Sequence, residues 1–590
     1  MKIGPREILL GTMKSLINSL NDTVTETLSG LSYTYPQLEY QESHKVFLMP
    51  NLEDQKDKVS IICGGGSGHE PFAAGFVGSG MLTASVAGSI FAAPPSQHVS
   101  YCIERLSQYS QAGILVVIPN YTGDCLNFGI AVEKARQSGF KVTEIIVNDD
   151  CSIPIKDQGV AGKRGLTGLL FVIKIAGALA ERGLPLEEIY DVAQNVLKNM
   201  ATYAVGLTPC NIPGQPPMFE LADDEIECGM GVHGEAGYEK AKLKTCSEVV
   251  SIMLKHICDS LCLINGDSVA AIINNFGALS QLEQGIVVHD LANQLREMNI
   301  ELLRVYSGVL MTSLNSAGIH ITLLKLPENY KDMFISYLDS PTAAPRWPGC
   351  AYSVPLKSRR TTIQVKVTEG AKQIGIKVNT QQQNLLRQCL KSACERIIEK
   401  ETVINDLDRG CGDGDCGTTL KRLASDILQK LDNFYVSHPS SVFSELAHIA
   451  EEQMGGTSGA LYCLLFTSLA AELVLAEEGK GWLFIWAKAL RSGLTCLIKY
   501  GKAKPGDRSM IDVMNAVCET YESALHNKMD DICTALKTAA WEACEATKNM
   551  KPKVGRASYV KQVQYLKNVD AGAYGVATWI GAIADVIKSI

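Results

Sequence analysis

The periodicity of the chain changes near residue 350, and this change limits the folds open to it. Before that point, short β-rich runs such as 59–63 and 114–118 alternate with glycine-rich turns and helical patterns. Further buried strands are predicted at 141–147 and 268–273. A repeated strand, loop and helix is typical of α/β architecture, in which ligands bind at the carboxyl ends of strands. We therefore expect an α/β first half.

After residue 380 no strand signal remains. Amphipathic patterns predict about eight helices with short connections, typical of a helical bundle or barrel. We place them at 381–400, 418–432, 441–453, 458–474, 482–500, 508–525, 529–548 and 572–589. The Pro-rich segment 340–349 and the polar stretch after it indicate a linker, in which 361–367 could add a strand. The predicted domains are 1–345 and 381–590, joined by a linker at 346–380.

Composition excludes several classes of protein. The chain has 590 residues, enough for about two to four domains. Its net charge is -8 without a basic block, which argues against nucleic-acid and anionic-membrane partners. The 19 cysteines show neither Cys-x-x-Cys nor zinc spacing, which favours a reduced, cytoplasmic compartment. Neither a signal peptide nor a membrane span is expected, since Lys174 and Glu472 interrupt the most apolar helices.

The first candidate ligand site is the run Gly64 to His69, which follows a predicted strand. Its backbone N–H groups and one imidazole can approach a small polar ligand. A tight turn without a ligand remains the alternative, and His69 is equally compatible with a helix cap. The run is not a P-loop, because no Gly-Lys-Ser/Thr follows.

Two further side chains are candidates for chemistry in the first half. His233 stands among glycines at 229–237, where small neighbours let a ligand approach the imidazole; a structural role is the alternative. Asp124 follows Thr-Gly in a loop at the end of a predicted strand. It can serve acid–base chemistry or cap the helix that follows, and one residue can fill both roles.

The second half contains a candidate metal site. Asp408, Asp413 and Asp415 stand close together among glycines, and three carboxylates repel one another unless a cation neutralises them. The spacing excludes an EF-hand and fits Mg²⁺ with nucleotide phosphates, because Mg²⁺ uses few carboxylates. Segment 454–459 offers N–H groups and hydroxyls for phosphate at a helix start, or simply close helix packing. Asp570 likewise precedes a helix and can be a cap alone.

Together these motifs resemble those of the ATP-dependent dihydroxyacetone kinases, in particular the animal triokinase/FMN cyclase branch, nearly end to end. The segments that carry the resemblance are GGGSGHEP at 64–71, NYTGD at 120–124, GVHGEAG at 231–237, LDRGCGDGDCGTT at 407–419, MGGTSGALY at 454–462, YGKAKPGDRSMID at 500–512 and GRASYV at 555–560. The resemblance implies a DhaK-type α/β substrate domain of two subdomains. It also implies a DhaL-type nucleotide domain that is an all-α eight-helix barrel.

The resemblance also implies an activity. Family members use Mg²⁺ and ATP to phosphorylate dihydroxyacetone, and in this branch also D-glyceraldehyde. A side activity, favoured by Mn²⁺ or Co²⁺, splits FAD into cyclic FMN and AMP. Members are homodimers in which the nucleotide domain of one subunit faces the substrate domain of the other. The expected partners are therefore a triose, ATP, FAD and a second copy of the chain.

The resemblance assigns roles residue by residue. His233 matches the histidine that forms a covalent hemiaminal with the substrate carbonyl, and Asp124 matches the carboxylate beside the reacting hydroxyl. His69 lies with Gly66, Ser67 and Gly68 in the segment around the triose. The metal ligands are Asp408, Asp413 and Asp415. The other positions matching nucleotide contacts, besides Asp413 and Asp415 themselves, are Gly414, Cys416, Thr457, Ser458, Gly501, Ser509, Met510, Asp570, Ala571 and Gly572.

One position departs from the family pattern. The family usually has lysine directly before Asn-Tyr-Thr-Gly-Asp, where this chain has Pro119. A lysine would donate to the substrate or to the transferred phosphate, whereas proline offers no donor and fixes φ. Two alternatives to a full kinase therefore stand beside it: a protein that mainly splits FAD, and a weakly catalytic regulatory homologue.

Overall fold

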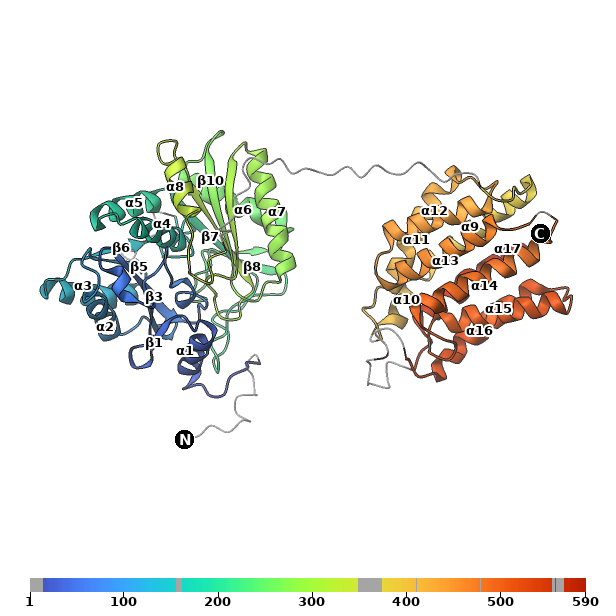
Figure 1. Cartoon of the computed structure of the whole chain (residues 1–590), viewed down its shortest axis with the longest axis horizontal. Coiled ribbons are helices and arrows are strands. Elements are labelled where there is room, and N and C mark those ends of the chain that lie inside the picture. The colour runs from blue at the N-terminus through green and yellow to red at the C-terminus, as the bar shows by residue number, and fades with distance from the viewer. Residues whose placement is uncertain are drawn as a thin grey trace. The chain divides into compact units, whose positions relative to one another are not determined.

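The structure is a computed structural model that describes residues 14–154, 162–348, 374–409, 411–477, 479–553, 558 and 567–589. The chain divides into two compact units, Met1–Thr361 and Thr362–Ile590, which are described separately (Figure 1). The possible strand at 361–367 and all of the 555–560 motif except Ser558 lie outside the described residues.

The first half of the N-terminal unit is a six-stranded sheet between two pairs of helices (Figure 1). The strand order is β1-β2-β4-β3-β5-β6, and β4, β3, β5 and β6 run parallel. The strands are β1 Glu39–Gln41, β2 Val46–Leu48, β3 Ser60–Ser67, β4 Ala84–Ile90, β5 Ile114–Pro119 and β6 Val142–Val147. The helices are α1 Thr23–Thr34, α2 Ser96–Ser107, α3 Thr122–Gln137, α4 Leu169–Glu181 and α5 Leu186–Lys198. β5 is buried on both faces, which explains its unbroken apolar sequence.

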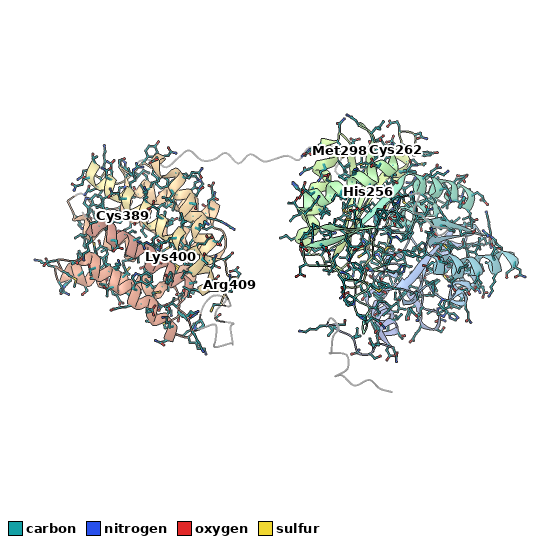
Figure 2. All side chains as sticks on the ribbon, turned by 180° about the vertical axis from the view of Figure 1, so that it is seen from behind. His256, Cys262, Met298, Cys389, Lys400 and Arg409 are labelled. Carbon is teal, nitrogen blue, oxygen red and sulfur yellow. The ribbon has the colours of Figure 1, made fainter. Side chains whose placement is uncertain are left out.

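The second half is a mixed six-stranded sheet in the order β11-β10-β12-β7-β8-β9. Its strands are β7 Met200–Gly206, β8 Glu225–Cys228, β9 Glu239–Lys242, β10 Ser268–Asn275, β11 Glu301–Gly308 and β12 Gly318–Lys325. The helices α6 Cys246–Leu261 and α7 Gln281–Glu297 pack on it, and α8 Lys331–Leu338 follows. Both covering helices begin with a capping box and end at neighbouring C-caps, Cys262 and Met298 (Figure 2). His256 of α6 stacks on Tyr203 of β7.

Both described ends of the predicted linker pack onto their own units. The Trp347 ring lies 4.5 Å from that of Tyr306, and Arg346 Nε donates to the Tyr35 hydroxyl at 3.0 Å. On the other side, the Val378 N–H donates to the Ser437 carbonyl at 2.9 Å. The domain boundaries given above stay predictions.

The C-terminal unit is a closed ring of eight helices, as predicted. Each packs on the next in the order α9, α11, α12, α13, α14, α15, α16, α17, and α17 packs back on α9. Their bounds are α9 Thr380–Glu399, α11 Cys416–Lys430, α12 Pro439–Gln453, α13 Gly456–Val474, α14 Trp482–Gly501, α15 Met510–His526, α16 Ile532–Ala546 and α17 Ala571–Lys588. The closed ring is the barrel that the family resemblance implies.

A ninth helix in the described part of this unit was not predicted. α10, Glu401–Asp408, lies between Lys400 and Arg409 (Figure 2). Lys400 serves as both the C-cap of α9 and the N-cap of α10, so neither Gly nor Pro marks the boundary in the sequence.

The ring has an apolar interior. A pocket of about 470 Å³ lies between the helices, with Phe443, Tyr462, Trp482 and Trp486 in its lining. Within the described residues, α13 is the one helix long and apolar enough to cross a membrane by length and composition alone. Since α13 packs between α12 and α14 as a member of the ring, this is weak evidence for a membrane segment.

Candidate functional site

The strand β3 continues into the predicted glycine loop. A Cβ on Gly64 would lie 2.1 Å from the Val86 carbonyl oxygen of β4, so only glycine lets the two strands pair here. The sequence predicted that this strand ends at residue 63, whereas it runs to Ser67. The turn begins at Gly68, where φ is +102°. His69 therefore stands just beyond the carboxyl end of a buried parallel strand, the usual place for a ligand in such sheets.

His69 is buried, and its tautomer is fixed by one contact. Its Nδ1 lies 2.8 Å from the Thr312 carbonyl oxygen, which can only accept, so Nδ1 carries the proton. Burial, together with nearby His233, lowers the pKa of His69 to about 3, so the ring is neutral at pH 7. Its Nε2 is buried without a hydrogen-bond partner among the described residues. That nitrogen keeps a lone pair with which His69 can accept a proton.

His233 stands edge-on to three aromatic rings. Its ring centroid lies 4.9 Å from that of His69, 5.3 Å from that of Phe91 and 4.3 Å from that of Tyr121. Burial and the positive charge of Arg164 lower the pKa of His233 to about 4. The imidazole is therefore neutral at physiological pH, the state in which it can act as a nucleophile.

Asp124 faces the glycine strand from the first turn of α3. A Cβ on Gly65 would lie 3.8 Å from Asp124 Oδ1, which is buried without a partner among the described residues. Burial raises the pKa of Asp124 to about 7, a value suited to a proton acceptor. The alternative of an N-cap is wrong, because Tyr121 occupies that position. A carboxylate in the first turn is still favoured by the helix dipole.

Several groups around these side chains were missed by the sequence analysis. Tyr121 and Glu235 lie inside the motif segments, so the motifs could have pointed to them. Phe91 stacks on His69 with centroids 5.0 Å apart, and Thr312 fixes its tautomer. These two reach the site from loops after β4 and β11, far from any motif, and carry no local signal.

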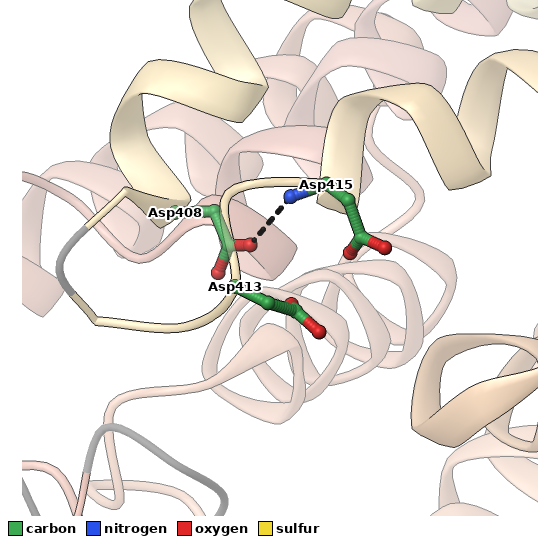
Figure 3. A group of neighbouring side chains, drawn as sticks. All are labelled: Asp408, Asp413 and Asp415. Carbon is green, nitrogen blue, oxygen red and sulfur yellow. Dashed lines mark hydrogen bonds between the residues drawn. The ribbon is translucent and has the colours of Figure 1, made fainter. Parts of the chain in front are cut away.

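The three predicted metal ligands lie together in the C-terminal unit (Figure 3). One ligand oxygen from each of Asp408, Asp413 and Asp415 lies within 4.8 Å of the others. Asp408 ends α10, and its Oδ2 accepts the N–H groups of Gly414 at 2.9 Å and Asp415 at 3.2 Å, which folds the loop back on the helix. An all-oxygen donor set of this kind fits a hard cation such as Mg²⁺.

Helix N-termini meet next to this loop. α11 begins directly after Asp415, and a Cβ on Gly572 in α17 would lie 3.6 Å from the Met510 Cβ in α15. Asp570 is the N-cap of α17 and accepts the Ala573 N–H at 2.9 Å. Burial raises the pKa of Asp570 to about 6, and Asp512 and Asp408 add to that effect. The N-termini of α11, α15 and α17 thus lie together beside the aspartates, an arrangement that favours an anion such as phosphate.

The same corner includes Ala571 at the start of α17, Ser509 as the N-cap of α15, and Cys416 at the start of α11. Burial, with Asp408 and Asp570 adding to it, raises the pKa of the Cys416 thiol to about 12. The thiol is therefore protonated and unreactive at neutral pH.

The remaining predicted nucleotide residues gather at α13. Thr457 and Ser458 lie in its first turn, after Gly455 and Gly456 with φ of +62° and +58°. A Cβ on Gly501, the last residue of α14, would lie 3.3 Å from Leu461 Cδ2 of α13. Further along α13, Tyr462 accepts a hydrogen bond from Trp579 Nε1 of α17 at 3.2 Å. The residues predicted to bind the triose thus lie in the α/β unit, and those predicted to bind the nucleotide lie in the helical unit.

Fold and site define a class: an α/β unit with a buried histidine and carboxylate group, followed by an eight-helix ring with three aspartates in one loop. Residues 29–346 match the Dak1 domain, and residues 410–585 match the DAK2 domain. The chain belongs to the dihydroxyacetone kinase family.

Three known proteins illustrate the similarity. Human triokinase/FMN cyclase is 37% identical over 588 residues, which cover 98% of this chain and 100% of the relative. The crystal structure of C. freundii dihydroxyacetone kinase in complex with AMP-PNP and Mg²⁺ is 29% identical with a TM-score of 0.64, covering 97% of this chain and 100% of that chain. The dihydroxyacetone kinase operon co-activator Dha-DhaQ is 30% identical with a TM-score of 0.51, covering 55% of this chain and 98% of that one.

Proposed function

We propose that this protein is an ATP-dependent kinase of dihydroxyacetone and D-glyceraldehyde that also splits FAD into cyclic FMN and AMP. The observation that carries the proposal is the buried group of neutral His69, neutral His233 and titratable Asp124. The aspartate loop of the second unit and the names of the full-length relatives support it.

The first step is capture of the triose by His233. A neutral ring nitrogen attacks the carbonyl carbon, a C–N bond forms, and the carbonyl oxygen becomes a hydroxyl as the other ring nitrogen loses its proton. The covalent bond fixes a small substrate that offers little surface for binding. It also selects carbonyl compounds over glycerol, which has no carbonyl carbon to attack.

Transfer then requires that the triose hydroxyl lose its proton. Asp124 would accept this proton, and His69 Nε2 would accept or relay it, a role typically worth about 10²–10⁴ in rate. Asp408, Asp413 and Asp415 would hold Mg²⁺, which neutralises charge on the phosphate oxygens when bound. The same aspartates would hold Mn²⁺ or Co²⁺ during FAD splitting.

We further propose that the protein is a cytoplasmic homodimer. The cysteines among the described residues are free thiols, which supports a reducing compartment. The dimer follows from the family resemblance, with the nucleotide unit of one subunit serving the substrate unit of the other.

A coupled assay with ATP, Mg²⁺ and dihydroxyacetone, run beside FAD with Mn²⁺, tests the proposal. Wild-type protein should catalyse both reactions, and His233→Ala should lose triose phosphorylation but keep FAD splitting. A crystal soaked with dihydroxyacetone should show density continuous with the His233 ring. Unlinked dihydroxyacetone beside His233 at full occupancy would contradict the covalent step.

A second candidate, mainly FAD splitting or a weakly catalytic regulatory role, is favoured by Pro119. This residue ends β5, is buried and offers no donor. A restored charged hydrogen bond is worth about 1.5–3 kcal/mol, so Pro119→Lys should raise kcat/KM for dihydroxyacetone roughly ten- to a hundredfold. FAD splitting is the control and should not change. A stable Pro119→Lys protein with unchanged or lower triose kinetics would remove the argument for this candidate.

A further inference from the structure

Arg164 joins the two ends of the loop that carries His233. Its Nη2 donates to the Gly229 carbonyl, and its Nη1 lies 3.3 Å from Glu235 Oε1. Its Nε donates to Asp150 Oδ2 at 2.7 Å, and the side chain of Asp150 is only 1% exposed. Because one planar guanidinium makes all three contacts, it fixes the loop relative to Asp150, whose backbone bridges to Thr202 of β7.

A second set of contacts leads from Arg164 to the His233 ring. Glu235 Oε1, held by Arg164, accepts the Tyr121 hydroxyl at 3.5 Å. The Tyr121 ring in turn lies edge-on to His233, with centroids 4.3 Å apart. A Cβ on Gly231 would lie 1.7 Å from Glu235 Oε1, so the carboxylate occupies the space that a side chain there would need. Arg164, Glu235 and Tyr121 thus form one support behind the imidazole.

We propose that Arg164 is a positioning residue for His233: it holds loop 229–235 in place through Gly229 and Glu235, and it brings a mostly buried positive charge to that loop. The inference rests on the proposed function, because it concerns the histidine that would bond to the triose.

The charges around His233 support this role. The groups that face it are His69 and Tyr121, both neutral at pH 7, and the ion pair of Arg164 with Glu235. Burial, with Arg164 adding to it, holds the pKa of His233 at about 4. Without Arg164, burial would still lower this pKa, but the positive charge would be gone and the unpaired Glu235 would favour the imidazolium, so the pKa should rise. An imidazolium has no lone pair with which to attack the carbonyl carbon. The pH below which triose capture fails would therefore be higher than in the wild-type protein.

The backbone beside Arg164 also lies against the position that lacks the family's lysine. A Cβ on Gly165 would lie 2.9 Å from the Pro119 Cα and 2.6 Å from the Asn120 N. The segment that carries Arg164 therefore packs directly on the end of β5. Arg164 brings a mostly buried cation to this part of the site, where residue 119 supplies none.

The test separates charge from geometry with Arg164→Gln and Arg164→Lys in the full-length protein. We would measure dihydroxyacetone binding without nucleotide by calorimetry from pH 3.5 to 8, and kcat/KM at pH 8. For Arg164→Gln, the pH below which binding is lost should rise by at least about one unit. Arg164→Lys keeps the charge but not the fork of donors, so it should keep that pH and lower kcat/KM.

Two further variants serve as controls. Arg136→Gln is the matched control, because Arg136 also pairs with two carboxylates, Glu133 and Glu144, but lies at the far end of α3. It should behave as wild type. Arg164→Gln leaves Asp150 buried without its cation and can fail to fold, so the double variant with Asp150→Asn restores a neutral pair. The double variant should show the same pH shift.

Each outcome decides one question. A folded Arg164→Gln or double variant with wild-type pH dependence and wild-type kcat/KM overturns the role of Arg164. A soaked wild-type crystal without a bond between His233 and the triose overturns the proposed function instead. If wild-type protein forms the bond and the pH limit moves only in the variants that lack the charge, both inferences hold.

Discussion

Burial sets the protonation states of the three candidate catalytic side chains. Loss of water disfavours the charged form of each group, so one environment shifts acids and bases in opposite directions. The pKa values of His69 and His233 fall to about 3 and 4, and that of Asp124 rises to about 7. The result is two neutral imidazoles and, against the glycine strand that leads to His69, a carboxyl group with a pKa near 7; such shifted values are typical of active sites.

The pKa of Asp124 predicts the pH profile of the kinase. A general base must be ionised, and Asp124 is protonated below about pH 7, so kcat/KM for the triose should rise with pH through about 7. Asp124→Asn should remove this limb and lower kcat/KM by about 10²-fold or more. FAD splitting in the same variant should stay at the wild-type level, because its aspartates lie in the other unit. A limb near pH 7 that persists in Asp124→Asn would show that Asp124 is not the base.

At the scale of elements, the glycines of β3 and α3 predict opposite effects on stability. A Cβ on Gly64 would meet the Val86 carbonyl oxygen at 2.1 Å, so Gly64→Ala should push β3 from β4 and cost about 1–3 kcal/mol or more. Gly129 lies in α3 with nothing within 4 Å of its Cβ position, so Gly129→Ala should stabilise the helix by about 1 kcal/mol. Scanning calorimetry should show Tm shifts of opposite sign. Equal shifts would mean that the close approach of β3 and β4 is not needed for stability.

The loop between α10 and α11 predicts linked losses of activity. Asp413→Ala removes one of three oxygens that would hold the cation, so both triose phosphorylation and FAD splitting should fall at least about a hundredfold. Mn²⁺ binding, followed by electron paramagnetic resonance, should weaken in parallel. Asp432→Ala is the control, since that side chain is 99% exposed in the same unit. Loss of only one activity would show that the two reactions use different metal sites.

Local sequence predicted most elements but not their contacts. The eight ring helices follow from apolar periodicity, whereas α10 was missed because Lys400 carries no boundary signal. The end of β3 was placed too early because glycine is read as a turn, although here it permits close strand pairing. The aspartates were found because they stand within one loop. Phe91 and Thr312 were not found, because their role depends on loops that only the folded chain brings to His69.

At the scale of the whole molecule, the residues that we propose for phosphoryl transfer are divided between the two units. The proposed triose residues His233 and Asp124 lie in the α/β unit, and the aspartates and helix N-termini proposed for the nucleotide lie in the helical unit. The proposed kinase reaction therefore needs both units, while the proposed FAD splitting would need only the helical unit. Because of this difference, measurements of the two activities can test the proposed dimer.

Two inactive variants should restore activity to each other. We would co-express His233→Ala with Asp413→Ala in equal amounts and purify the whole pool of dimers without separating them. If the nucleotide unit of one subunit serves the substrate unit of the other, each mixed dimer contains one site with both parts intact. Random pairing then gives about a quarter of wild-type kinase activity, because half of the dimers are mixed and each has one active site of two.

FAD splitting should be about half of wild type whatever the arrangement, since only Asp413→Ala removes it. Kinase activity at the background of the separate variants, with FAD splitting at half, would mean that each subunit works alone.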